Sequence, residues 1–357
     1  MDNEKSVRFF LASNTTEGFY SLYQGFVSPG PDCFFWVIKG GPGCGKSTFM
    51  KKIGAAAEAR GAGVEYIHCS GDPDSLDAVY IPALGVAYAD GTSPHVMEAV
   101  YPGACSSYLD LGRFYDIPGL RSSTSGIVEL NTRYKAMYAR AYSFLRAAGA
   151  ASPKRIAAER FPDVCELIKK RADGVASREL DSIRGRHGTV SRRFLSSFTY
   201  KGAYCFPETV DAACDRIYSL DNSLGLAAVF LSSIAHAASG RGLDTVLCPD
   251  PLLPERLEAV FVPQQRLGFI AAPADKGIKK RDSDRHLRLD AMVDTQLLHT
   301  LRPEIRSETR LFDSLTEKGK ASLHSAKLFH DELEKFYVNH IDFDGLDQEA
   351  EKHIAGL

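Results

Sequence analysis

A glycine-rich segment constrains the fold of this chain more than any other feature. Residues 40–47, GGPGCGKS, fit the pattern G-x-x-x-x-G-K-[ST]. The aromatic and β-branched run FFWVI at 34–38 precedes the segment and predicts a buried strand. The helix-forming run STFMKKIGAAAEAR follows, and Gly61 is suited to the position just after the helix end. A strand, a glycine loop and a helix in this order predict a phosphate-binding loop in an α/β protein.

The residue types of this loop suit phosphate binding. Glycines let the backbone pass close to phosphate oxygens and point its N–H groups at them, and the following helix adds partial positive charge. We expect Lys46 to neutralise the β- and γ-phosphates and the Ser47 hydroxyl to help hold Mg²⁺. The predicted nucleotide-binding residues are Gly40, Gly41, Pro42, Gly43, Cys44, Gly45, Lys46, Ser47 and Thr48. Cys44 is expected to be a small loop residue, with a reactive thiol as the alternative because a helix N-terminus lowers a thiol pKa.

A magnesium site also needs an acidic residue near the loop. Residues 84–90, LGVAYAD, form an apolar run that ends in a carboxylate, as a Walker-B strand does. Ligands bind at the carboxyl ends of strands in open α/β sheets, so Asp90 is predicted to hold Mg²⁺ together with Ser47. Lys46 and Asp90 are the predicted catalytic residues. Other residues compete for the metal or could activate the attacking water: Asp72, Asp74, Asp77 and His95.

An internal repeat divides the chain. RFFLASNTTEG at 8–18 resembles RRFLSSFTYKG at 192–202, and LDAVYIP at 76–82 resembles LEAVFVP at 257–263, in the same order. The repeat predicts a tandem duplication with two largely parallel sheets flanked by helices. Residues 1–185 are expected to form a P-loop nucleotide-binding domain. Residues 186–357 are expected to form a degenerate P-loop-like domain with C-terminal helices.

The second copy is predicted to lack the phosphate and metal groups. Aligning Cys69 with Cys248, and carrying the alignment back without a gap, places YSLDNSLGLAAVFLSS at 218–233 opposite the glycine loop. Lys46 is then replaced by Gly225 and Ser47 by Leu226. In the later register that aligns Pro82 with Pro263, Asp90 is replaced by Ala271. This joint loss strengthens the assignment of Asp90 to the metal and predicts no phosphate binding of this kind in the second copy.

Four segments resemble a known family. They are VIKGGPGCGKSTFMKKI, HCSGDPDSLDAVYIPALGVAYADGTSPHV, YPGACSSYLDLGRFYD and HDELEKFYVNHIDFDGLD, and they are similar to segments of the poorly characterised tandem P-loop ATPase-like proteins of spore-forming bacteria. The resemblance covers nearly the whole chain and implies P-loop domains in tandem, with ATP as the nucleotide. In that family the second half often carries a phosphate loop as well, and this chain departs from that pattern with SLDNSLGL.

Composition limits the partners and the compartment. The net charge of −2 argues against a mainly electrostatic nucleic-acid or membrane partner. The N-terminal residues lack the apolar core of a signal peptide, and the eight cysteines show no C-x-x-C pair. These features favour a reduced, cytoplasmic protein.

The remaining segments suggest helices and basic loops. Residues 127–148 and 312–336 have helical spacing of apolar residues and are expected to cover their own sheets, or else to meet a partner or the other copy. Basic stretches at 182–193 and 277–288 offer four candidates for an arginine-finger role, Arg184, Arg186, Lys280 and Arg281.

The residues and the resemblance together favour Mg²⁺-dependent ATP binding and slow hydrolysis at a single loop, coupled to a conformational change. One alternative is a kinase that passes the γ-phosphoryl group to a small molecule or nucleotide, which would need a pocket beside 72–77. Another is a non-catalytic ATP-sensing scaffold that binds an unidentified protein partner through its helices or its second copy. The loop itself reads only phosphates, so it does not distinguish ATP from GTP.

Overall fold

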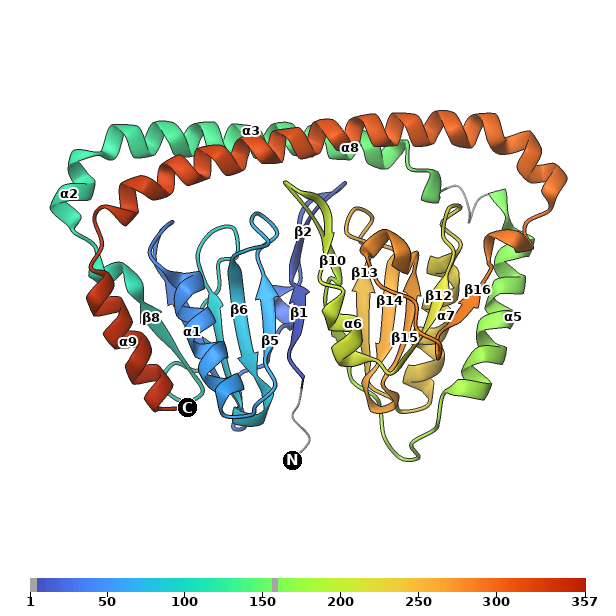
Figure 1. Cartoon of the computed structure of the whole chain (residues 1–357), viewed down its shortest axis with the longest axis horizontal. Coiled ribbons are helices and arrows are strands. Elements are labelled where there is room, and N and C mark those ends of the chain that lie inside the picture. The colour runs from blue at the N-terminus through green and yellow to red at the C-terminus, as the bar shows by residue number, and fades with distance from the viewer. Residues whose placement is uncertain (1–4, 156–159) are drawn as a thin grey trace.

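The computed structural model describes residues 5–155 and 160–357, and within these ranges it contains two six-stranded sheets beneath two long helices (Figure 1). The first sheet consists of β1 (Val7–Phe10), β4 (Phe34–Lys39), β5 (Glu65–His68), β6 (Leu76–Ile81), β7 (Val86–Asp90) and β8 (Ser106–Asp110). Its strand order is β1-β5-β6-β7-β4-β8. Neighbouring strands are parallel except at β6, which runs antiparallel to β5 and β7.

The second sheet repeats this plan. It consists of β9 (Val190–Arg192), β12 (Arg216–Leu220), β13 (Thr245–Pro249), β14 (Leu257–Val262), β15 (Leu267–Ala271) and β16 (Arg285–Leu287). Read from β9, the strand order is β9-β13-β14-β15-β12-β16, and β14 is the strand that runs antiparallel to its neighbours. The two orders match strand for strand. The predicted α/β class, with two mostly parallel sheets flanked by helices, is confirmed.

Strand register corrects the alignment of the two halves. A β-bulge interrupts the β5–β6 ladder between Ile67 and His68, and another interrupts the β13–β14 ladder between Cys248 and Pro249. Because Ile67 and Cys248 each directly precede a bulge, the two residues match. This is the register that aligns Pro263 with Pro82, and the expected match of Cys248 with Cys69 is wrong. The helices that follow the two loops begin at Lys46 and Ala227, so Ala227 rather than Gly225 stands opposite the lysine. The predicted loss of the lysine is unchanged by this correction.

One helix lies beside each sheet directly after the glycine-loop position, α1 (Lys46–Ala59) in the first half and α7 (Ala227–Gly240) in the second. The others are α2 (Ile117–Ser122), α3 (Thr124–Ala150), α5 (Pro162–Glu179), α6 (Glu208–Ala213), α8 (Thr295–Val338) and α9 (Phe343–Ala355). Short 3₁₀ turns are η1 (Tyr23–Gly25), η2 (Pro82–Leu84), η3 (Leu111–Phe114), η4 (Pro153–Arg155), η5 (Pro263–Gln265), η6 (Pro273–Lys276) and η7 (Asp290–Met292).

The long helices α3 and α8 lie side by side across both halves (Figure 1). Helix α8 has 44 residues, a length of about 66 Å at 1.5 Å per residue, which is enough to span both sheets. The Asp294 side chain caps its first turn by accepting hydrogen bonds from the N–H groups of Gln296 and Leu297. Leu145 of α3 packs against Gly319 of α8, where a Cβ atom would lie 2.8 Å from the leucine.

Each half receives a helix from the sequence region assigned to the other half. Helix α9 packs on α1, and its Leu346 and Ala350 join the core of the first half. Helix α5 packs on α7, and its Ile168 and Ala172 join the core of the second half. The expectation that residues 127–148 and 312–336 cover their own sheets is wrong, because the helices α3 and α8 that contain them pack chiefly on each other, as the alternative of contact with the other copy allowed. Helices α3 and α8 each run from one half to the other, so α5, which follows α3, and α9, which follows α8, lie in the opposite half.

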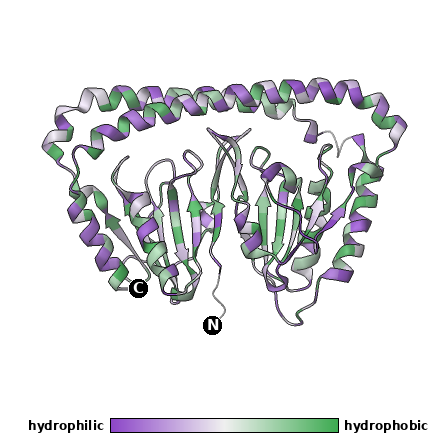
Figure 2. Ribbon diagram, viewed as in Figure 1, coloured by the Kyte–Doolittle hydropathy of each residue, from purple (hydrophilic) through white to green (hydrophobic). Residues whose placement is uncertain are grey.

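Two antiparallel hairpins lie between the sheets. They are formed by β2 (Ala12–Thr15) with β3 (Gly18–Ser21), and by β10 (Ser196–Thr199) with β11 (Gly202–Cys205). Figure 1 shows β2 and β10 side by side, and the Ser197 hydroxyl donates to the carbonyl oxygen of Ala12 at 3.1 Å. Figure 2 shows apolar residues concentrated in the strands of both sheets, whereas α3 and α8 alternate between polar and apolar residues. Within residues 5–155 and 160–357, no helix has the length and apolar character needed to span a bilayer.

Candidate functional site

Loop 40–47 connects β4 to α1 and has the backbone shape that its glycines allow. Gly43 and Gly45 adopt φ values of 66° and 79°, in the left-handed region that favours glycine. Gly45 is the N-cap of α1, and its missing side chain leaves the first helical N–H groups without a side-chain cap. This helix start is therefore available to an anion.

Lys46 folds back across the loop. Its Nζ atom donates to the carbonyl oxygens of Gly40 and Gly41 at 2.7 and 2.8 Å. The same atom lies 3.5 Å from Oδ2 of Asp90, and only 12% and 14% of the two side chains are exposed. The structure thus brings together the two residues predicted to be catalytic, which belong to separate segments of the sequence.

The carboxylate of Asp90 is held in a fixed orientation. Its Oδ1 atom accepts hydrogen bonds from the backbone N–H and the hydroxyl of Thr92, at 2.8 and 2.6 Å. Its Oδ2 atom is turned toward Lys46. The Ser47 hydroxyl oxygen accepts a hydrogen bond from the backbone N–H of Leu76 at 2.9 Å, which places Ser47 against the start of β6. Carboxylate and hydroxyl oxygens are ligands that Mg²⁺ prefers, so Ser47 and Asp90 suit this ion.

Asp77 is a second carboxylate at this edge of the sheet. Because Ala78 pairs with Ala89, Asp77 and Asp90 occupy the next opposed positions on β6 and β7. Asp77 is buried, and its Oδ2 atom accepts from the Tyr23 hydroxyl at 2.9 Å and lies 3.2 Å from Nε2 of His95. Burial alone would raise the pKa of Asp77, but His95 and the Tyr23 hydrogen bond outweigh it and lower that pKa.

His95 is part of the same cluster and is not a free loop residue. Its ring centre lies 4.3 Å from that of Tyr23 and 5.1 Å from that of Phe19. Its Nδ1 atom is buried and has no hydrogen-bond partner among the described residues. Of the water-activating candidates, Asp77 and His95 therefore lie together beside Asp90.

The other two acidic candidates are engaged by cations from elsewhere in the chain. Oδ2 of Asp72 lies 3.4 Å from Nζ of Lys327 on α8. Oδ2 of Asp74 lies 2.8 Å from Nζ of Lys201, which belongs to the β10–β11 hairpin. Both aspartates therefore connect the first half to elements contributed by the second half of the sequence.

The end of α8 lies directly against loop 40–47. A Cβ atom built on Gly43 would lie 3.1 Å from the carbonyl oxygen of Glu334 and 3.2 Å from Cγ2 of Val338. A Cβ atom built on Gly41 would lie 3.3 Å from the ring of Tyr337. Sequence reasoning missed this contact, although the segment HDELEKFYVNHIDFDGLD that contains these α8 residues also carries the family resemblance.

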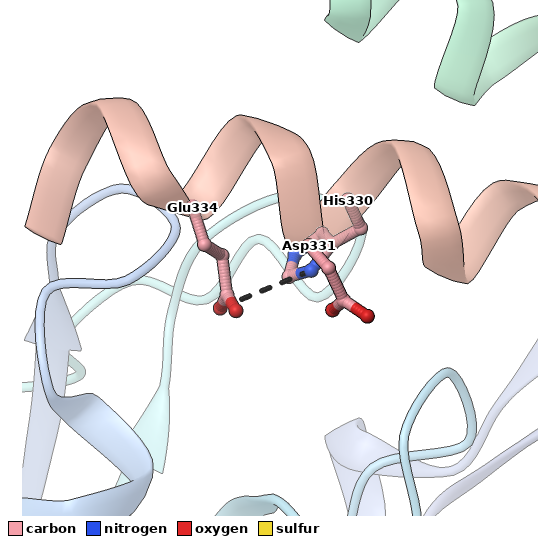
Figure 3. Close-up of side chains that lie close together, drawn as sticks. All are labelled: His330, Asp331 and Glu334. Carbon is pink, nitrogen blue, oxygen red and sulfur yellow. Dashed lines mark ion pairs between the residues drawn. The ribbon is translucent and has the colours of Figure 1, made fainter.

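A small group of metal-ligating side chains lies on the same part of α8. His330, Asp331 and Glu334 have donor atoms within 4.8 Å of one another, and Figure 3 shows them extending from the helix toward the loops of the first half. His330 Nδ1 lies 3.8 Å from Glu334 Oε1, and Asp331 forms an ion pair with Lys327. Burial lowers the pKa of His330. The lysine neutralises one member of this group, which weakens it as a metal site.

Cys44 lies inside the loop. Its sulfur would be 2.5 Å from a Cβ atom on Gly40, so the thiol fills the space that this glycine leaves open. Burial raises the pKa of Cys44 and outweighs the opposing effect of Lys46. The alternative of a reactive thiol with a lowered pKa is therefore wrong.

Loop 221–226 occupies the matching place in the second half. The carboxylate of Asp221 accepts a hydrogen bond from the backbone N–H of Asp290 at 3.0 Å, and the Asp290 carboxylate accepts one from that of Ser223 at 2.9 Å. A Cβ atom on Gly225 would lie 2.3 Å from the carbonyl oxygen of Lys154. Two carboxylates thus bind the backbone N–H groups of this region, and their charge disfavours phosphate.

A lysine lies at the place in the second half that matches Asp77 and Asp90. In the register set by the two β-bulges, Glu258 matches Asp77 and Ala271 matches Asp90. Lys276 Nζ lies 3.3 Å from Oε2 of Glu258 and donates to the carbonyl oxygen of Ala271 at 2.9 Å. The second half thus has one carboxylate paired with a lysine where the first half presents two carboxylates.

The basic stretches do not reach the first loop. Arg186 forms an ion pair with Asp244, and Arg281 forms ion pairs with Asp211 and Asp284, all within the second half. Arg184 and Lys280 are exposed residues of that half.

Comparison with models of known protein families, with curated proteins and with solved structures finds no match for this chain. The geometry around loop 40–47 is therefore the main guide to function.

Proposed function

We propose that the protein binds ATP with Mg²⁺ at loop 40–47 and hydrolyses it slowly, coupling the nucleotide state to the paired helices α3 and α8. In this proposal the two halves arose by tandem duplication of a P-loop unit, and the second copy has lost its site. The proposal rests chiefly on the 3.5 Å approach of Lys46 to Asp90 across a glycine loop whose helix N-terminus has no side-chain cap.

The residues of the site divide the work of binding. The backbone N–H groups of the loop and the Lys46 ammonium group bind phosphate oxygens. Ser47 and Asp90 would hold Mg²⁺, which supplies charge neutralisation between the β- and γ-phosphates when it is bound. Lys46 now bonds to the carbonyl oxygens of Gly40 and Gly41, and it would exchange these bonds for phosphate contacts.

Hydrolysis also requires an oriented water molecule. Burial opposes the charge of Asp77, but His95 and the Tyr23 hydrogen bond lower its pKa, and the residue lies opposite Asp90 in the ladder. We assign Asp77 and His95 to the positioning of this water, with Tyr23 fixing the orientation of the carboxylate through the bond at 2.9 Å.

The contacts of Asp72 and Asp74 favour hydrolysis over phosphoryl transfer to a second substrate. An acceptor for a kinase was expected in a pocket beside residues 72–77. Lys327 and Lys201 instead form ion pairs with the two aspartates there, and Asp77 is buried. These contacts occupy the acceptor's expected place.

The long helices provide the coupling. Helix α8 begins after η7, whose Asp290 binds Ser223 of loop 221–226, and it ends against Gly43 of loop 40–47. Helix α3 runs the other way, and the turn η4 after it places the carbonyl oxygen of Lys154 against Gly225. A shift of loop 40–47 on nucleotide binding would therefore press on a helix that reaches the second half. This contact also suits the scaffold alternative, in which a partner protein reads the position of these helices.

Steady-state phosphate release from ATP tests the proposal. Wild type should release phosphate only with Mg²⁺, Lys46→Ala should release none, and Lys52→Ala should behave as wild type. Lys52 is a matched control because it lies on α1 and forms a surface ion pair with Asp347 at 2.6 Å. Release that persists in Lys46→Ala would contradict hydrolysis at this loop. Nucleotide binding without release in wild type would favour the scaffold.

A further inference from the structure

A hollow of about 520 Å³ opens beside loop 40–47 on the side away from Asp90. Two segments far apart in the sequence line it, residues 113–116 after β8 and residues 339–342 between α8 and α9. The loop and the acids account for the phosphates and the metal. They leave open where the base and ribose of a nucleotide would bind.

The sheet order determines on which side of the loop the nucleoside must lie. Strand β4, which leads into loop 40–47, has β7 with Asp90 on one side and β8 on the other, all three parallel. The carboxyl end of β8 therefore opens at the same edge as the loop. Tyr115 follows η3 there, and its hydroxyl would be 2.9 Å from a Cβ atom on Gly41. With the metal on the β7 side, the β8 side is free for the nucleoside.

Backbone hydrogen bonds preform the floor of the hollow. Tyr115 and Ile341 form an antiparallel bridge. The backbone N–H of Asp116 donates to the carbonyl oxygen of His340 at 2.8 Å, and that of Asp342 donates to the carbonyl oxygen of Phe114 at 2.9 Å. The two segments are thus joined on both sides of the bridge, so a ligand would meet an ordered surface.

The side chains of the hollow suit a nucleoside. Phe114 and Tyr115 are half-buried rings on which a flat base can stack, and the Arg113 guanidinium lies 4.7 Å from the centre of the Phe114 ring. Oδ2 of Asp116 lies 3.3 Å from Nδ1 of His340, and 54% and 28% of these side chains are exposed. A carboxylate and an imidazole at the rim can accept and donate hydrogen bonds to hydroxyl groups.

The second half provides a contrast at the matching place. There the segment after β16 is bound directly to loop 221–226, because Asp221 accepts from the N–H of Asp290 and Asp290 accepts from that of Ser223. In the first half, Asp110 at the end of β8 instead accepts from its own neighbour Gly112 at 2.8 Å. Within the described part of the chain, the segment after β8 thus meets loop 40–47 through the Tyr115 hydroxyl and not through carboxylate bridges like those that join its counterpart to loop 221–226.

We propose that this hollow binds the base and ribose of the nucleotide, with Phe114 or Tyr115 under the base and with Asp116 and His340 at the ribose hydroxyls. This inference rests on the proposed function of loop 40–47. Its consequence is that nucleoside recognition depends on residues 339–342, which α8 connects to the second half. A purine nucleotide would then hold the end of α8 in place through two sets of contacts, at the loop and at the hollow.

Calorimetric titration with two ligands separates the hollow from the loop. One ligand is ATP with Mg²⁺, and the other is inorganic tripolyphosphate with Mg²⁺, which carries the phosphates alone. His340→Ala and Asp116→Asn should weaken ATP binding about ten-fold or more and change tripolyphosphate binding less than about two-fold. Asp116→Asn retains an oxygen that can cap α2 through Gly119. Asp313→Ala, an exposed aspartate on α8, is the matched control and should bind both ligands as wild type does.

Other results of these titrations would overturn the assignment of the hollow. ATP affinity within two-fold of wild type in both variants would overturn the assignment of the hollow, as would an equal loss for ATP and tripolyphosphate. Wild type that binds tripolyphosphate as tightly as ATP would overturn it too, while leaving a phosphate site at the loop. Wild type that binds neither ligand would overturn the proposed function and this inference together.

Discussion

Phe10 and Phe194 donate backbone hydrogen bonds to each other's carbonyl oxygens, at 2.9 and 2.8 Å, and form an antiparallel bridge between the two halves. They occupy the same position in the repeated segments RFFLASNTTEG and RRFLSSFTYKG, and both are fully buried. A residue that pairs with its own counterpart is the mark of a two-fold interface. This arrangement agrees with the proposed duplication and means that the halves are packed as a pair.

An ion pair beside this bridge should contribute strongly to stability. Nε of Arg193 lies 2.5 Å from Oε1 of Glu65, its guanidinium also donates to the carbonyl oxygen of Phe26 at 3.0 Å, and both ion-pair side chains are nearly buried. Arg193→Ala leaves the Glu65 charge unpaired and should lower the free energy of unfolding by about 3–5 kcal/mol. The double variant Arg193→Met/Glu65→Leu should lose less, as measured by urea unfolding. A single variant within about 1 kcal/mol of wild type would contradict this role.

A buried histidine should make the fold sensitive to mild acid. Burial lowers the pKa of His68 to about 4, although its Nδ1 atom lies 2.7 Å from the carbonyl oxygen of Pro73. Because the folded state keeps the ring neutral, the contribution of His68 to the free energy of unfolding is complete above pH ~6.5. This contribution is lost as the pH falls toward ~4, because over that range the unfolded chain binds a proton that the folded chain does not. The loss is on the order of 3 kcal/mol. Urea unfolding from pH 7.5 to 4.5 should show a shallower decline for His68→Phe than for wild type.

An exposed histidine serves as the control for that series. His299 lies on the exposed side of α8, and His299→Ala should keep the wild-type dependence on pH. An unchanged slope in His68→Phe would assign the acid sensitivity to other groups.

Gly225 should tolerate no side chain. Its φ of 77° strains any L-residue, and a Cβ atom would lie 2.3 Å from the carbonyl oxygen of Lys154. Gly225→Ala should lower the free energy of unfolding by at least about 2 kcal/mol and move η4, which contains Lys154, away from loop 221–226. Gly174→Ala is the matched control, because Gly174 lies in α5 with open space around it and should gain up to about 1 kcal/mol. Equal effects of the two changes in thermal unfolding would contradict the contact.

Asp90 should govern the magnesium requirement. Asp90→Asn keeps an oxygen for the two Thr92 hydrogen bonds and removes the charge that faces Lys46. The Mg²⁺ concentration for half-maximal phosphate release should rise about ten-fold or more, with nucleotide binding retained. Asp72→Asn, at a carboxylate paired with Lys327, should change that concentration less than about two-fold. The same requirement in Asp90→Asn and wild type would remove Asp90 from the metal site.

The sequence predicts the local parts of this site well. Loop 40–47 and α1 follow from glycine spacing and helix propensity, and the position of Asp90 follows from an apolar run that ends in a carboxylate. These features depend on residues close together in the chain, where backbone preferences and strand geometry decide the structure.

The long-range parts of the structure are not predictable in this way. The spacing of apolar residues in α8 shows that one face is buried, but it does not say which sheet the helix covers. Tyr337 and Glu334 reach Gly41 and Gly43 from the far end of the sequence, and nothing local to either segment indicates it. The alignment of Cys69 with Cys248 failed because Cys69 follows the end of β5 whereas Cys248 lies within β13, so the matching letters fall on unmatched ladder positions.

Binding of a non-hydrolysable ATP analogue, with Mg²⁺, to wild type and to Lys46→Ala tests the single nucleotide site most directly. We expect one analogue per chain for wild type, since loop 221–226 lacks the lysine, and binding at least about 100-fold weaker for Lys46→Ala. Lys52→Ala should bind as wild type does. Wild-type affinity in Lys46→Ala, or two analogues per chain, would contradict a single nucleotide site at loop 40–47.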